Sequence, residues 1–73
     1  MELTAFDKVI VVEPFRRFNG WVIGIKPESD GSTTFIVEPL RVDFTPHKTG
    51  SRLMRINSKE IENNTVTIEK HEI

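Results

Sequence analysis

Hydrophobic residues along this chain come in short runs rich in β-branched and aromatic side chains, and Gly, Pro, Asn or Asp interrupts them roughly every eight to twelve residues. This spacing is typical of an all-β domain, because each run is long enough for one strand and each interruption contains turn-forming residues. The runs predict strands over residues 8–12, 21–26, 33–38, 53–56 and 65–69.

Alternation within the runs predicts which side chains face the core. In the second run, Trp21, Ile23 and Ile25 fall on one face of an ideal strand, and in the third run Phe35 and Val37 do the same. The core predicted in this way consists of Val9 or Ile10, Val11, Trp21, Ile23, Ile25, Phe35, Val37, Leu53, Ile56, Ile61, Val66 and Ile68.

Turn signals between the runs predict how the strands connect. Asp30 and Gly31 offer the positive φ of a tight turn, so the second and third strands should form a hairpin. Pro14 ends the first strand, and a long connection should follow it. Asn19 and Gly20 offer an alternative, a type I′ turn that would make the first connection a hairpin centred on them.

The second half of the chain is less regular. A partial strand is expected over residues 40–44. Asn57 followed by Glu60 has the spacing of a helical capping box, which predicts one helical turn through about Ile61. Residues 70–73 are expected to fray, as chain ends commonly do.

Five short strands with a long first connection, a hairpin in the middle and one helical turn before the last strand resemble the SH3-like barrel superfamily at the level of the fold. Residues 1–73 are expected to form one five-stranded barrel domain. Closing a sheet into a barrel suits a small chain, because one layer of strands then buries its own inner face and leaves few open edges. An OB-like barrel is the alternative architecture.

A narrower resemblance lies in residues 19–25 and 35–37, where a glycine, an alternating strand, a loop and a second strand follow one another. This pattern is similar to that of KOW modules. The resemblance implies binding of RNA, or of ribosomal and transcription proteins, through the loops of the barrel.

Composition removes several classes of protein and site. The chain has no cysteine, which excludes disulfides, thiol nucleophiles and zinc sites built on cysteine. Its net charge of −1 argues against a polycation that coats nucleic acid non-specifically. No apolar run approaches the roughly 20 residues that span a bilayer, and the N-terminal stretch lacks the features of a secretory signal. We therefore expect a cytoplasmic protein without a membrane partner.

The most distinctive segment places two arginines between aromatic rings: Phe15, Arg16, Arg17 and Phe18, with Trp21 close behind. Arginine offers a planar charged fork to phosphate or carboxylate, and exposed rings stack on bases or on the guanidinium itself. The segment is a candidate binding loop. In the alternative interpretation this segment binds no ligand. The arginines are then solvated, and the rings cover one end of the fold.

A second basic stretch lies between residues 41 and 55. Together with residues 14–20 it contains six of the ten Lys and Arg residues but only one of the eleven acidic ones, Asp43. If the two stretches lie side by side, they form a basic patch able to meet phosphates or an acidic protein surface. The candidate binding residues of this stretch are Arg41, Phe44, Lys48, Arg52 and Arg55.

Catalysis has little support in the sequence. His47 and His71 are the only histidines and have no ligand-like spacing, so we predict no catalytic residue, no metal site and no cofactor. The expected function is that of a non-enzymatic binding module. Nucleic acid is the first candidate partner, and the alternative is a protein-interaction module or an accessory inhibitor. The oligomeric state does not follow from the sequence.

Overall fold

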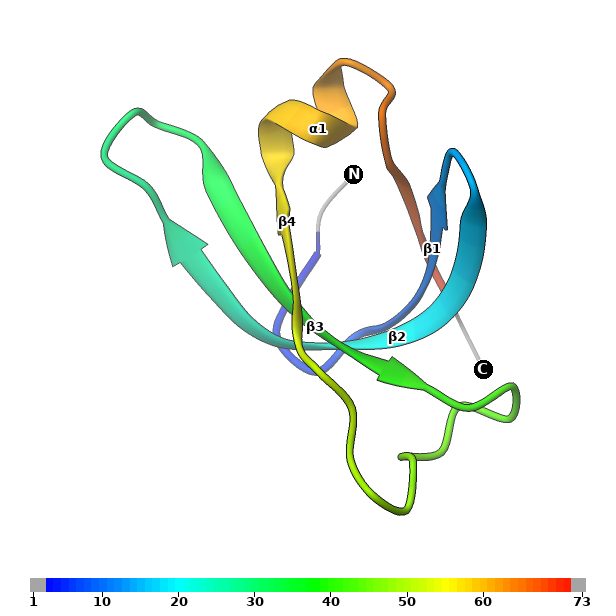
Figure 1. The fold of residues 1–73 in the computed structure, drawn as a ribbon. Helices are drawn as coiled ribbons and strands as arrows, with labels where there is room; N and C mark the ends of the chain where they lie inside the picture. The colour runs from blue at the N-terminus through cyan, green and yellow to red at the C-terminus, as the bar shows by residue number, and fades with distance from the viewer. Residues whose placement is uncertain (1–2, 72–73) are drawn as a thin grey trace.

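A computed structural model describes residues 3–71 of the chain as one antiparallel sheet with a single short helix (Figure 1). Along the sheet the strand order is β4-β3-β2-β1-β5. The helix lies between β4 and β5 in the chain, so the all-β prediction with one helical turn before the last strand is confirmed. The elements are β1 (Lys8–Glu13), β2 (Arg16–Pro27), β3 (Thr33–Leu40), β4 (Met54–Asn57), α1 (Ser58–Glu62) and β5 (Thr67–Lys70).

The sheet is strongly curved, and β2 forms most of the bend. Figure 1 shows β2 running from its hairpin with β1 around to its hairpin with β3 on the other side of the molecule. β4 and β5 are the two edge strands, and within residues 3–71 they do not pair with each other. The sheet is therefore open there, and the expected closed barrel is not confirmed.

The first connection differs from both predictions made for it. β1 and β2 pair from Glu13 opposite Arg16 onward, so Pro14 and Phe15 alone form the turn of a tight hairpin. Gly20 lies inside β2 and is buried. A turn there would break the pairing of β2 with both of its neighbours, so the sheet overrides the local Asn-Gly signal.

The face that β2 presents to the core is also different from the prediction. Val22 pairs with Val37, and both are fully buried, whereas Trp21 points to the opposite face and is only half-buried. Ile23 has no partner in β3, which marks a β-bulge that reverses the alternation beyond it. Ile25 therefore returns to the core side, but it lies near the end of the hairpin and remains 39% exposed.

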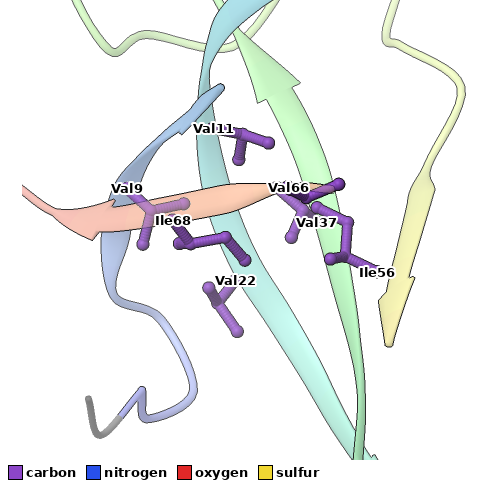
Figure 2. Packing of buried hydrophobic residues seen from close by; sticks show 7 residues of the cluster. All are labelled: Val9, Val11, Val22, Val37, Ile56, Val66 and Ile68. Atoms are coloured by element: carbon purple, nitrogen blue, oxygen red, sulfur yellow. The ribbon is translucent and has the colours of Figure 1, made fainter. Parts of the chain in front are cut away.

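The core lies on the concave side of the sheet and consists of aliphatic side chains. Leu3, Phe18, Phe35 and Ile61 are partly buried and pack against it. The predicted core residue Leu53 does not belong to it, because it lies in the loop before β4 and is 46% exposed. Figure 2 shows the seven residues of the buried cluster pointing toward one another, six from strands and Val66 from just before β5: Val9, Val11, Val22, Val37, Ile56, Val66 and Ile68.

Residues 41–50 form a loop that folds back on the outer face of the sheet, where a partial strand over 40–44 was expected. Leu40 is the last residue of β3 and forms one isolated bridge with Pro46. A turn reverses the chain between them, with the Phe44 N–H donating to the Arg41 carbonyl at 2.9 Å. The loop buries Leu40, which the sequence analysis did not assign to the interior.

The helical turn begins and ends as its cap residues predict. The Asn57 side chain accepts a hydrogen bond of 2.9 Å from the Lys59 N–H, so Asn57 is the N-cap. Asn63 is the C-cap, and Asn64 follows with a φ of 63°, a left-handed conformation that a helix cannot continue. α1 has five residues, and no helix within residues 3–71 is long and apolar enough to cross a membrane.

The C-terminal part of the chain is more ordered than the prediction of fraying over residues 70–73. Lys70 belongs to β5, and the His71 N–H donates to the Lys8 carbonyl at 2.8 Å, which extends the pairing of β5 with β1. Residues 72–73 lie outside the described residues.

Candidate binding surface

Phe15 stands at the tip of the β1–β2 hairpin and is fully exposed. The ladder between β1 and β2 continues up to Glu13 and Arg16, so the hairpin supports the turn on both sides. A single exposed hydrophobic residue is not unusual, so the neighbours of Phe15 decide whether it belongs to a binding surface. Phe15 is the most exposed large hydrophobic residue of residues 3–71.

The side chain of Arg16 forms contacts within the molecule. Its Nε donates to the Glu13 carboxylate, and its guanidinium lies over the Phe18 ring, 5.1 Å from the ring centre. Its Nη2 also lies 3.6 Å from the Met54 Sδ at the start of β4. Arg16 therefore stabilises the concave side of the sheet, and Phe18 lies beneath it instead of offering a free face.

Arg17, in contrast, points to the outer face and joins the loop that follows β3. It is exposed and lines an open hollow of about 400 Å³ together with Val42. The amide of Asn19 fixes this contact, because its Nδ2 donates to the carbonyls of Val42 at 3.0 Å and Arg41 at 3.3 Å. One asparagine in β2 thus holds the loop beside Arg17.

The loop presents Arg41 and Val42 to solvent. Val42 is 93% exposed and lines a second open hollow with Arg41, Asp43 and His47. The Asp43 carboxylate accepts hydrogen bonds from the hydroxyl and the N–H of Thr45, which hold the pKa of Asp43 below its usual value. The nearby charge of Arg41 also lowers the pKa of Asp43, although the two side chains form no ion pair.

Phe44 does not lie beside Phe15 and Phe18, where a continuous aromatic patch would need it. It adopts a φ of 62°, and its ring stacks on His71 with 4.1 Å between ring centres. It lines a small hollow with Trp21 and other residues of the outer face, so it closes the loop onto the sheet. Because of this contact, Phe44 does not offer a free ring to a ligand.

The remaining predicted residues lie farther along the chain and divide into two groups. Lys48 and Arg52 are exposed on the loop before β4. Arg55 lies within β4, opposite Ile36, and lines a polar hollow at the β2–β3 hairpin. That level of the sheet is seven residues along β2 from Arg17, or about 23 Å in an extended strand, so the structure does not join Arg55 to Arg17.

We call Phe15, Arg17, Arg41 and Val42 the hairpin surface. Within residues 3–71 neither arginine forms an ion pair, and both apolar side chains are almost free of contact. Sequence reasoning found three of the four residues and missed Val42. The available signal was a lone valine between Arg41 and Asp43 in a stretch without alternation, which has no strand partner to bury it.

The described residues were also compared with the arrangement of a metal site. No three His, Asp or Glu side chains gather within residues 3–71 as they would around a metal ion. Comparison with protein-family models, with curated protein sequences and with solved structures gives no match for this chain.

Proposed function

We propose that this chain is a non-enzymatic binding module that holds an acidic protein surface through the hairpin surface. The observation that carries the proposal is that Phe15 and Val42 are almost fully exposed and that Val42 lines open hollows with Arg17 and with Arg41. Neither arginine forms an ion pair within residues 3–71. Aromatic side chains and arginines are enriched at the centres of protein interfaces, where they contribute most of the binding energy.

The choice of a protein over a nucleic acid follows from the number of free rings among the candidate binding residues. Single-stranded nucleic acids are held by several aromatic faces on which successive bases stack. Arg16 covers Phe18, and His71 covers Phe44, which leaves Phe15 as the one candidate ring of the predicted set that is free. Val42 has no π-face for a base, but it fits an apolar patch on a protein.

Nucleic acid is the second candidate, because a free ring and arginines without ion pairs also suit a base and its phosphates. Within either function, we propose that the domain is of the SH3-like type. The strand order and the helical turn before β5 support this assignment. The tight turn between β1 and β2 departs from the long first connection that the resemblance implies.

The test is affinity capture from the lysate of the protein's own cells, with the wild-type chain compared with Arg17→Glu and Arg41→Glu. We expect the wild type to retain a protein that added salt releases, that nuclease treatment leaves in place and that both variants lose. Retention that depends on intact nucleic acid, together with salt-sensitive binding of short DNA or RNA in fluorescence anisotropy, would favour the second candidate. Equal capture by wild type and variants would contradict both.

A further inference from the structure

A second interaction surface lies along β4, apart from the hairpin surface. β4 pairs through Met54–Asn57 with β3 on one side only, and no other strand lies along its second side within residues 3–71. None of the backbone hydrogen bonds formed outside the strands and helix in these residues reaches β4. Because the groups of an antiparallel strand alternate in direction, half of its N–H and C=O groups point away from β3.

The residues of β4 itself and of the segment just before it carry positive charge and apolar surface. Arg55 is exposed on the outer face of β4, and Arg52 and Leu53 are exposed just before the strand begins. Within residues 3–71 neither arginine forms an ion pair. β5, the other edge strand, has a different character, because Glu69 accompanies Lys70 there and Lys70 pairs with Asp7 at 3.6 Å.

We propose that β4 is a docking edge for an extended acidic segment of a protein partner, which adds to the sheet as a further strand. Strand addition takes its affinity from main-chain hydrogen bonds and its specificity from alternate side chains. On the outer face, acidic side chains of the segment would meet Arg55. On the other face, apolar side chains would continue the row formed by Ile56, which Figure 2 shows pointing from β4 toward the core.

The neighbours of β4 limit the length of the segment. At one end Arg16 contacts Met54, and at the other Asn57 caps α1, which turns the chain away from the strand direction. The free edge is the length of four residues, or about 13 Å. The segment should therefore pair over about four residues. Its acidic residues should occur at every second position, because alternate side chains of a strand point to the same face.

The probe is a peptide of about seven residues that alternates Glu and Val, with blocked ends, titrated into the ¹⁵N-labelled chain. We expect the amide signals of Met54–Asn57 to shift and their hydrogen exchange to slow about tenfold. A peptide of the same sequence with N-methyl groups at alternate backbone nitrogens keeps every charge but loses donors to the edge, so it should leave these signals unchanged.

Two variants complete the test. Arg55→Glu should weaken binding of the peptide about tenfold or more, because it places like charges opposite each other. Lys70→Glu makes the same change of charge on the other edge strand and should leave binding unchanged. Arg52→Glu serves as a second variant if Arg55→Glu alters the fold. Equal shifts from the N-methylated peptide, shifts on β5 or on the hairpin surface instead of β4, or no shifts would each overturn the inference.

The same titration separates this inference from the proposed function. Phe15→Ser removes the exposed ring of the hairpin surface without touching β4, so it should leave peptide binding unchanged. If Phe15→Ser abolished the β4 shifts, the two surfaces would be one and the inference would fail. Failure of the peptide to bind β4 would leave the capture experiment with Arg17→Glu and Arg41→Glu unaffected.

Discussion

The guanidinium of Arg16 reaches to 3.6 Å from the Sδ of Met54, so the first hairpin of the sheet touches the first residue of β4. Arg17, its neighbour in sequence, points to the opposite face and has no ion pair within residues 3–71. Two adjacent arginines thus have different surroundings, one in the fold and the other on its surface. Substitution of Arg16 therefore tests stability, and substitution of Arg17 tests binding.

Substitution of Arg16 by alanine should lower the free energy of unfolding by about 1 kcal/mol, because it removes a cation–π contact and an ion pair with Glu13. Arg17→Ala should change the same quantity by less than about 0.5 kcal/mol, as expected for an exposed residue. Chemical denaturation measures both. Equal effects of the two substitutions would show that the Arg16 contacts do not stabilise the fold.

Gly20 should tolerate no side chain, because a Cβ there would lie 2.4 Å from the Cγ1 of Val37, which is buried and stiff. We expect Gly20→Ala to lower the free energy of unfolding by about 1–3 kcal/mol, the range for overpacking in a core. Gly24→Ala is the matched control: its Cβ would lie 3.3 Å from the Cδ1 of Ile36, the end of a flexible side chain that can move. Thermal unfolding of the two variants should show a clear difference in Tm.

Most strands of this fold follow from the sequence, because runs of β-branched residues between turn signals predict strands whatever their partners are. The face of β2 could not be predicted in the same way. The bulge at Ile23 depends on pairing with β3, and it reverses an alternation that looks regular from Trp21 to Ile25. The Asn-Gly signal at Gly20 failed for a related reason, since tertiary pairing overrides a local turn preference.

The candidate site could be predicted only in part, because the sequence shows where charges and rings occur but not which of them contact one another. Phe15, Arg17 and Arg41 were predicted and are exposed. Phe18 and Phe44 were predicted on the same grounds, but Arg16 and His71 cover them. The contact between Phe44 and His71 joins residues far apart in the chain, so no local pattern reveals it. The contact between Arg16 and Phe18 requires both residues to lie on one face of a strand, and the sequence predicted a loop there.

Asn19 should control the position of the loop that presents Arg41 and Val42. Asn19→Ala removes both side-chain hydrogen bonds to the carbonyls of these residues. We expect trypsin to cleave after Arg41 several-fold faster in this variant, because local opening exposes the chain to the protease. Asn63→Ala removes a side-chain contact with Thr65 far from the loop and should leave cleavage after Arg41 unchanged.

Stability should depend on pH through aspartates whose pKa the fold lowers. Hydrogen bonds from Lys59 and then from Ser32 lower the pKa of Asp30, and the Thr45 hydroxyl and N–H lower that of Asp43. When the pKa of a carboxyl group is lower in the folded state than in the unfolded state, the group stabilises the fold at pH values above its unfolded pKa of 3.8. This contribution is lost as the pH falls toward the pKa of the folded state. The free energy of unfolding should therefore stay level between about pH 7 and 5 and decline below about pH 4.

Asp30→Asn provides the control for this pH dependence. Because it removes one of the titrating groups, the decline in the free energy of unfolding below about pH 4 should be shallower than in the wild type. The measurement is a series of denaturant titrations across the pH range. A decline of the same slope in Asp30→Asn would show that the contact between Asp30 and Lys59 does not form in solution.

Phe15 should contribute to binding but not to folding. Phe15→Ser removes a ring that is fully exposed, so the free energy of unfolding should change by less than about 0.5 kcal/mol. Affinity for the protein captured by the wild type should fall about tenfold to a hundredfold, as expected for an aromatic residue at the centre of an interface. Titration calorimetry with the purified partner measures this change.

Photo-crosslinking from the hairpin tip tests the central claim most directly. A photoreactive phenylalanine analogue placed at position 15 should form an adduct with a protein partner in the lysate, and added salt or Arg17→Glu should suppress it. The same analogue at position 67, exposed on β5, should not form that adduct. An adduct with nucleic acid from position 15, or the same protein adduct from both positions, would contradict the claim that the hairpin surface binds an acidic protein.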